Sequence, residues 1–462
     1  MNNDAHNQEY RKQRMLVEPM SKIIPSMAIP TIIAFLINSI YSLTDTYFVS
    51  SLGTNATAAV SVNTSLDALI MMTGSLMAIG ANSYIARLLG AKDERKASRV
   101  LSTAFFIAMG LGLILLILGV SFMKPMVHLL GATATCERYA IEYATYVLLV
   151  APFMAGNFVM NQCLRAEGSA VLSMIGMGAG GILNCVLDPI FIFGLDMGVA
   201  GASIATAISK LVSFAILVFP YLTRRSLLRI SPRLCKFDRD IIGQIVTVGS
   251  SSMFRSGLSV ISGIILNNIA GGISDACLAG IGVANKIMMF PFSIILGFGS
   301  GFQPVAGFNW GARRYDRVLD SYRYSARVAI IGAAAMALLL GAFAEPTIRL
   351  FSETDPEMQR IGALCIRLQC LALPIHGWVA VVNMFCAGLG YAKGALILAT
   401  ARQGSCFIPI VFPMAALWGS FGVSAVQAVA DLLTLLLAIP IIRIMLRRVH
   451  DARKLAENAR AA

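Results

Sequence analysis

Long apolar stretches limit most strongly what this chain can fold into. The sequence contains twelve of them, each ended by charged residues, glycine or proline. A helix needs about 20 mainly apolar residues to cross the hydrocarbon core of a bilayer, and each stretch is that long. The sequence therefore predicts an all-α, polytopic membrane protein with twelve transmembrane helices. The predicted spans are 23–52, 60–86, 100–123, 139–163, 170–194 and 198–222, followed by 241–270, 278–308, 324–345, 361–388, 395–416 and 420–446.

The composition agrees with a membrane protein and excludes other classes. Hydrophobic residues make up 57% of the 462 residues and charged residues 13%, about half of the ~25% that soluble domains carry. The nine cysteines never form a C-x-x-C pair, so neither a zinc knuckle nor an extracellular disulfide framework is expected. Residues 1–22 are polar and basic and lack the apolar core of a signal peptide, which indicates a tail followed by a retained first helix.

Lysines and arginines are distributed unequally between the two sides of the predicted helices. If the N-terminus is cytoplasmic, 28 of the 37 basic residues fall in the inner segments and four in the outer segments. The positive-inside rule then predicts that both termini are cytoplasmic. These basic residues lie in the segments between the spans and do not form one basic face of a folded domain. No nucleic-acid partner is therefore expected.

The chain repeats itself at an offset of 221 to 222 residues. Each half contains six spans, and an even number means that both copies enter the membrane in the same direction, as parallel repeats. We predict an N-terminal tail (1–22), an N-lobe (23–222), a basic cytoplasmic linker (223–240), a C-lobe (241–446) and a C-terminal tail (447–462). The matching positions are Gly90 with Gly311, Gly201 with Gly422, Pro152 with Pro374, Asn161 with Asn383, and Gly168 with Gly390.

The sequence points to a secondary transporter. It contains no phosphate-binding loop and no soluble stretch long enough for a nucleotide-binding domain, so direct ATP drive by this chain is not expected. Two parallel six-helix lobes are the layout of a transporter that rocks about a site between its halves. An enzyme is not expected, because the chain has four histidines and no H-E-x-x-H motif. The only expected cofactor is a transported coupling ion.

Four oxygen-bearing side chains of the first half fall at similar depths. At 1.5 Å per residue, Asp45 lies about 10 Å and Asp188 about 9 Å below the outer ends of their spans. Asn184 shares a helix face with Asp188, at about 15 Å, and Thr206 falls at about 12 Å. An ionisable residue at such depth is costly and therefore a candidate functional group. We predict that the four form an ion-coupling site.

The chemistry of these four side chains is compatible with two kinds of coupling ion. Two carboxylates, an amide and a hydroxyl suit a small hard cation, because oxygen ligands replace its water and the negative charges offset its own. The same pair could hold a proton, because two close carboxylates in a low dielectric cannot both stay ionised. A structural alternative is that Asp188 and Pro189 end a helix and that Asp45 pairs with Lys210.

The other acidic residues of the spans are expected to be solvated or paired and not to bind the coupling ion. Asp67 and Glu142 lie within a turn or two of the outer ends of their predicted spans, where solvated or snorkelling side chains are expected. Asp431 is expected to pair with a basic residue near its helix.

The motifs of the chain resemble those of the multidrug and toxic compound extrusion (MATE) family, and the resemblance covers essentially the whole sequence. Its details are closest to the MepA-like branch of bacterial drug exporters. The N-lobe segments are NSIYSLTDT at 38–46, SLG at 51–53, NQCLRAEG at 161–168, ILNCVLDP at 182–189 and GVAGASIAT at 198–206, and the C-lobe segments are GFQPVAGFNWGA at 301–312 and ARQ at 401–403.

The resemblance implies a V-shaped pair of six-helix bundles in the bacterial inner membrane. Such a protein exports amphipathic drugs in exchange for Na⁺ or H⁺, and a monomer is expected. The family positions of an N-lobe cation site match Asp45, Asn184, Asp188 and Thr206, with Tyr41 one turn before Asp45. A C-lobe cation site is not expected, because residues 251–259 and the tenth span contain no acidic residue.

The second half instead carries basic residues within its spans: Arg255, Lys286, Arg367 and Arg402 against Asp431. One interpretation is that an anionic or zwitterionic substrate contacts Arg255. The other is that these side chains snorkel or bond to helix carbonyls, Arg402 above all.

Substrate contacts are predicted at Asn38, Arg255, Gln303 and Met288, although methionine within a span is more often plain packing. The lone His376 receives no role. An alternative function is a flippase for lipid-linked saccharides, for which a longer chain or additional helices would be expected.

Overall fold

The computed structural model describes residues 13–133, 135–223, 225–351 and 355–461, and within them every regular element is helical. This confirms the predicted all-α membrane fold. The long helices of the first half are α2 (Met20–Ser50), α3 (Thr54–Gly90), α4 (Glu94–Ser121), α6 (Glu137–Ala166), α7 (Ala170–Pro189) with η1 (Ile190–Gly194), and α8 (Gly198–Leu222). Those of the second half are α9 (Arg239–Ile273), α10 (Asp275–Gly311), α11 (Tyr315–Ala342), α13 (Pro356–Gly388), α14 (Ala392–Thr400) with η3 (Ala401–Ser405), and α15 (Phe407–Ala461).

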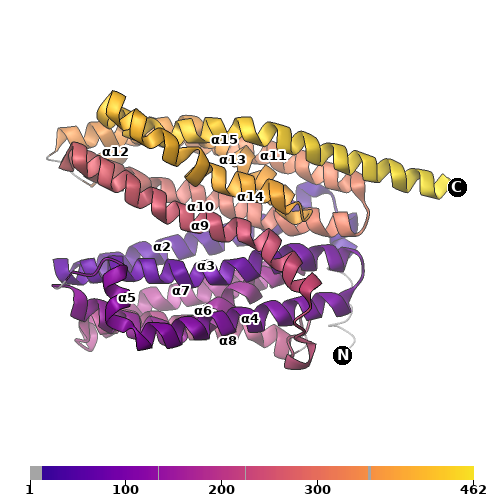
Figure 1. Ribbon diagram of the computed structural model, residues 1–462, viewed down its shortest axis with the longest axis horizontal. Coiled ribbons are helices and arrows are strands. Elements are labelled where there is room, and N and C mark those ends of the chain that lie inside the picture. Colours follow the sequence, from indigo (N-terminus) through magenta and orange to yellow (C-terminus); the bar gives the residue numbers. More distant parts are fainter. Residues whose placement is uncertain (1–12, 134, 224, 352–354, 462) are drawn as a thin grey trace.

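The last two predicted spans form one helical stretch with a break. In the described part of the chain, 11 stretches are long and apolar enough to cross a membrane, and the last of them covers residues 392–459. Gly419 interrupts that stretch with a left-handed backbone (φ 53°), which a residue without Cβ adopts readily. The chain reverses direction there (Figure 1), so the two arms supply the last two of the twelve crossings.

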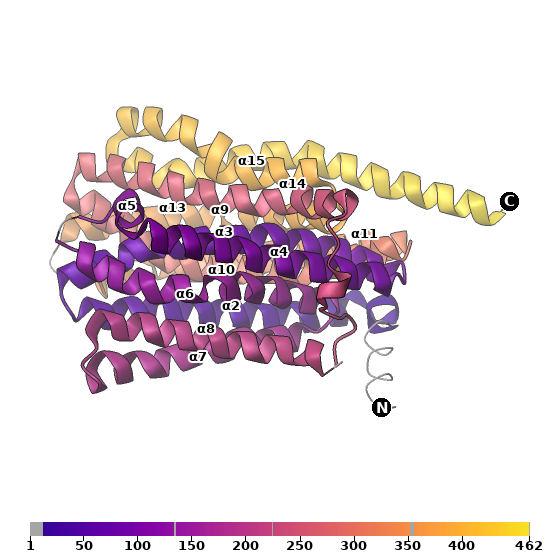
Figure 2. The same cartoon turned by 60° about the horizontal axis from the view of Figure 1, so that its bottom comes forward.

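The two halves form two layers of roughly parallel helices (Figure 1). Helix α2 begins and α15 finishes at the same end of the molecule, which we call the terminus-bearing end; the other is the far end. Figure 2 shows the same arrangement from another side, with α15 projecting beyond the other helices. An even number of crossings accounts for this placement, because it returns the chain to the side where it started.

Glycines join the two halves at the terminus-bearing end. A Cβ added to Gly80 of α3 would lie 2.0 Å from the Ile245 carbonyl oxygen of α9, and one added to Gly249 of α9 would lie 1.8 Å from the Leu76 carbonyl oxygen of α3. Only glycine permits backbones to approach so closely. A second reciprocal pair joins α3 to α10: Gly90 with Phe308, at 2.0 Å, and Gly311 with Arg87, at 1.9 Å. We call these four contacts the glycine seam.

The linker between the halves packs against the first half. Ser102 of α4 donates to the Arg229 carbonyl (3.1 Å), and the Glu167 carboxylate accepts from the Leu227 amide (2.9 Å). The side chain of Leu228 is completely buried. These contacts fix the path of the linker up to Arg239, where α9 begins.

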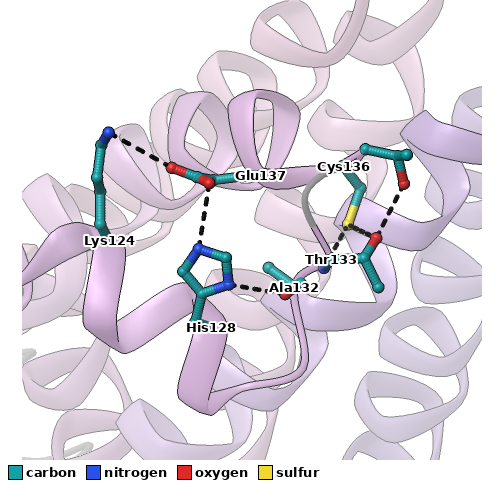
Figure 3. A network of polar contacts seen from close by, with 7 residues as sticks. Lys124, His128, Ala132, Thr133, Cys136 and Glu137 are labelled. Atoms are coloured by element: carbon teal, nitrogen blue, oxygen red, sulfur yellow. Dashed lines mark hydrogen bonds and ion pairs between the residues drawn. The ribbon is translucent and has the colours of Figure 1, made fainter.

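Two short helices at the far end escaped sequence prediction, α5 (Met123–Leu129) and α12 (Ala344–Arg349). A polar network ties α5 to the start of α6 (Figure 3). The Glu137 carboxylate lies 3.1 Å from His128 Nε2 and 3.6 Å from Lys124 Nζ, while His128 Nδ1 lies 2.9 Å from the Ala132 carbonyl oxygen.

Replacing Glu137 by glutamine is expected to lower the free energy of unfolding by less than about 1 kcal/mol, because exposed ion pairs contribute little. The Lys124 side chain is 75% exposed, so solvent screens its charge. Thermal unfolding in detergent measures the effect, with the wild type as the reference. A loss of several kcal/mol would show that the network holds the far end together.

Candidate functional site

Three predicted site residues meet between α7 and α8. Asn184 lies one helical turn before Asp188, and its Nδ2 donates to Asp188 Oδ1 (3.3 Å) and to Thr206 Oγ1 of α8 (3.2 Å). All three side chains are buried. Pro189 follows Asp188 and lacks the amide that a regular helix needs, and the chain continues as the π-helical turn η1. The turn fixes Asp188 at the point where the regular helix stops.

Asp45 of α2 joins this cluster through its charge. The side chain is buried, and the Tyr143 hydroxyl of α6 donates to its Oδ2 at 3.5 Å. The charges of Asp45 and Asp188 interact, so their carboxylates repel each other when both are ionised. The site therefore draws groups from α2, α6, α7 and α8.

Tyr41 and Lys210 form the neighbouring part of the site. The Lys210 ammonium lies 4.8 Å from the centroid of the Tyr41 ring, a cation–π contact. Lys210 also interacts through its charge with Asp67 and Asp45, but no ion pair within 4.0 Å joins it to either carboxylate in the described chain. The alternative of a direct Asp45–Lys210 ion pair is thus not seen in this conformation.

Asp67 differs from its sequence prediction. It was expected to be solvated near the end of its span, yet its Oδ1 is buried and it lines a cavity of about 280 Å³ together with Tyr41 and Lys210. The reason is the length of α3, which begins at Thr54 and not near residue 60, so that Asp67 lies about 20 Å along the helix. Its negative charge belongs to the site.

The unpaired acceptors show what the site lacks. Asp45 Oδ1, Asp67 Oδ1, Asn184 Oδ1 and Asp188 Oδ2 are buried without a hydrogen-bond donor. Buried oxygens in this state are costly, and a bound cation or proton would compensate them. A small cavity of about 10 Å³, lined by Asn184, Thr206 and Lys210 among others, offers room for about one water-sized species.

The oxygens of the site come from carboxylate, amide and hydroxyl groups. Nowhere in the described ranges do three His, Cys, Asp or Glu side chains lie close enough together to form a metal-ligand cluster. Amide and hydroxyl oxygens would have to complete the coordination, which suits a hard ion of low charge.

The C-lobe contains a second cavity, of about 360 Å³, with basic side chains. It lies between α9, α10, α13 and η3 and is lined by Arg255, Phe292, His376 and Arg402 among others. Arg402 Nε donates to Asp431 Oδ1 (2.7 Å), which confirms that Asp431 pairs with a basic residue. Of the interpretations offered for Arg402, bonding to helix carbonyls is not seen, because its described hydrogen bonds go to the Asp431 carboxylate.

Arg367 has a counter-ion and does not lie in the protein interior. Its side chain is 50% exposed and pairs with Glu345 of α12 at 3.0 Å. Among the predicted substrate contacts, Asn38 lines the N-lobe cavity and Arg255 the C-lobe cavity. Met288 is completely buried in the C-lobe core and Gln303 packs near Gly388, so neither lines a described cavity in this conformation.

Comparisons with known proteins agree with this architecture. The family model MatE matches residues 30–190 and 252–413. The multidrug export protein MepA of Staphylococcus aureus (strain MSSA476) is 29% identical over 444 residues, which cover 95% of this chain and 97% of MepA. MepA of Staphylococcus saprophyticus is 28% identical over 433 residues, covering 93% and 95%.

Solved structures show the same fold. An outward-facing multidrug resistance MATE family transporter has a TM-score of 0.90 and 25% identity, with 95% of this chain and 98% of that chain covered. A MATE protein in complex with MaL6 also has a TM-score of 0.90 and 25% identity, covering 95% and 99%. The sequence, the fold and the family model agree: the chain belongs to the MatE family of membrane transporters, as its motifs predicted.

Proposed function

We propose that this chain is a secondary active multidrug exporter that exchanges amphipathic compounds for Na⁺ or H⁺ bound in the N-lobe. The observation that carries the proposal is the set of buried, unpaired oxygens contributed by Asp45, Asp67, Asn184 and Asp188. The names of the MepA relatives support the export of multiple drugs. The uneven distribution of basic residues supports cytoplasmic termini, with the terminus-bearing end inside.

Helix α2 gives the ion site a mechanical connection to the other lobe. It carries Tyr41 and Asp45, and its Ser39 Oγ lies 2.8 Å from Ser293 Oγ of α10. Closer to the terminus-bearing end, Gly297 of α10 lets the backbone of α2 approach at Ile32. A shift of α2 at the ion site therefore changes its contacts with α10 at the boundary between the lobes.

The ion changes the charge of the N-lobe during the cycle. With Asp45, Asp67 and Asp188 ionised, Lys210 offsets only one of three negative charges. An arriving cation or proton reduces the repulsion and permits α2, which contains Pro25 and Pro30, to repack. One positive charge moving inward releases about 2.3 kcal/mol per 100 mV, which can drive drug movement outward.

The ion is identified by transport into inverted membrane vesicles that contain the full chain. A sodium gradient and a pH gradient are imposed separately, and we expect one of them to drive accumulation of a fluorescent organic cation. The gradient that drives accumulation identifies the coupling ion. Vesicles without the protein, and vesicles whose gradient has been collapsed by an ionophore, are the controls. Transport driven by neither gradient would contradict ion exchange.

A further inference from the structure

The membrane-embedded charges of the two lobes are opposite in sign. The N-lobe site has three acids, Asp45, Asp67 and Asp188, and one base, Lys210, whose charge interacts with those of Asp67 and Asp45. The C-lobe has the reverse: Arg255 and Arg402 line one cavity, Lys286 lines another together with Arg402, and the acid Asp431 pairs with Arg402. The coupling site accounts for the acids of the N-lobe. It gives no role to the bases of the C-lobe.

Corresponding positions of the repeat carry this inversion. At the offset of 221 that relates Gly201 to Gly422, Lys210 corresponds to Asp431. At the offset of 222 that relates Gly168 to Gly390, Gly180 of α7 corresponds to Arg402 of η3. The base of the N-lobe site is thus replaced by an acid in the C-lobe, and Arg402 stands where the N-lobe has a glycine. The second lobe has the same scaffold with a positive interior.

Asp431 neutralises only one of the C-lobe cations. Arg402 uses Nε and Nη2 to bind its carboxylate, at 2.7 and 3.5 Å. Arg255 has the Ser252 hydroxyl as its hydrogen-bond partner (3.1 Å), and no carboxylate lies within 4.0 Å of its nitrogens in the described part of the chain. A guanidinium within the membrane and without a counter-ion is costly, which marks Arg255 as a binding group.

The walls of the cavity suit an amphipathic molecule. Phe292 lies edge-on to the His376 ring (5.2 Å between centroids), and the Arg402 guanidinium covers the Phe292 ring at 4.6 Å. His376 Nδ1 is buried without a hydrogen-bond partner, 4.0 Å from Asp431 Oδ1. The volume of about 360 Å³ falls within the range of ~300–1,000 Å³ typical of drug-sized ligands.

We propose that the C-lobe cavity binds the carboxylate of amphipathic anionic or zwitterionic substrates, with Arg255 as the group that receives it. A planar guanidinium can hold a carboxylate through two parallel hydrogen bonds, and the aromatic wall packs against the apolar body of the ligand. This inference specifies the substrate class of the exporter proposed above and rests on that function only for transport. Binding itself needs no gradient.

A matched pair of dyes tests the proposal: a rhodamine with a free carboxylate and the methyl ester of the same dye. Binding of each to the purified full-length protein is followed by fluorescence anisotropy without an ion gradient. We expect Arg255→Gln to weaken binding of the free acid about ten- to hundredfold, the size of a lost charged hydrogen bond. The ester, which presents no negative charge there, should change by less than about threefold.

Two further variants separate charge from structure. Arg255→Lys keeps the positive charge but loses the planar guanidinium that can form two parallel hydrogen bonds. This variant should therefore retain part of the affinity for the free acid. Arg367→Gln removes a C-lobe cation outside both cavities and should bind both dyes as the wild type does. Gel filtration and thermal unfolding of every variant establish that it is folded.

Three results would overturn the proposal. These are equal losses for both dyes in Arg255→Gln, an unchanged affinity for the free acid, and a wild type that does not bind the free acid. The proposed exchange fails by a different result, absence of gradient-driven transport, and charge-selective binding could persist in that case. The two failures are therefore distinguishable.

Discussion

Asp188→Asn is expected to abolish ion-driven export and to leave the protein folded. Asparagine keeps the shape of the side chain and can still bond with Asn184, which lies 3.3 Å away, but it removes the negative charge. Two unit charges about 4 Å apart interact by about 4 kcal/mol at an effective dielectric constant of ~20, so ion affinity should fall roughly hundred- to thousandfold. Efflux of a fluorescent cation in inverted vesicles measures the loss.

Folding and ion coupling can be separated in this experiment. Asp188 is a buried charge whose Oδ2 has no hydrogen-bond donor, so its removal takes away a desolvation cost. The unfolding temperature of the ion-free variant should therefore not fall. Stabilisation by the coupling ion should disappear, because an ion that no longer binds cannot favour the folded state. Normal efflux by the variant would remove Asp188 from the mechanism.

Glu142→Gln is the matched control. Glu142 also lies in a predicted span of the N-lobe, but it lines none of the described cavities. We expect its efflux to remain within about twofold of wild type, the scale of changes at surface positions without special contacts. Asp45→Asn should instead resemble Asp188→Asn, because the two carboxylates share one electrostatic environment.

The helical architecture was predictable because it depends on local composition. Stretches of about 20 apolar residues define the spans regardless of how they pack. The depth of Asp45, Asn184, Asp188 and Thr206 followed from helix geometry, and the structure brings Asn184, Asp188 and Thr206 into contact. Whether these residues bind the coupling ion stays a prediction.

Partners that depend on tertiary packing could not be found from spacing. Asp67 was placed too near a helix end because the predicted apolar stretch begins at residue 60, whereas α3 begins at Thr54. The Arg402–Asp431 pair joins residues 29 positions apart on different segments. Tyr143, which donates to Asp45, was missed because a tyrosine in a span carries no distinctive signal. The repeat offers one usable signal, since it aligns Asp431 with Lys210, a residue already suspected of pairing with an acid.

The glycine seam also escaped sequence analysis, because a glycine in an apolar stretch does not disclose which helix it faces. Its role can be tested with Gly249→Ala. The new Cβ would lie 1.8 Å from the Leu76 carbonyl oxygen, so α9 and α3 must separate at the terminus-bearing end. Overpacking costs typically about 1–3 kcal/mol, which would shift the balance between closed and open seams roughly five- to 150-fold.

We therefore expect Gly249→Ala to populate a state that is open at the terminus-bearing end and to slow efflux about tenfold or more, because the cycle needs both states. Spin labels at Arg99→Cys of α4 and Lys454→Cys of α15, with the native cysteines replaced, report the separation of the lobes. Their distance distribution should move to longer values. Gly243→Ala on the same helix is the control, because a Cβ there meets nothing within 4 Å.

The reciprocity of the seam makes the effect specific to the boundary between the lobes. Gly80 and Gly249 each face a carbonyl of the other's helix, so neither substitution disturbs the packing inside one lobe. Gly80→Ala should consequently reproduce the shift of Gly249→Ala, and both proteins should unfold at nearly the wild-type temperature. A large drop in that temperature without a change in label distance would assign the glycines to folding. A longer label distance at an unchanged unfolding temperature would assign them to the transport cycle.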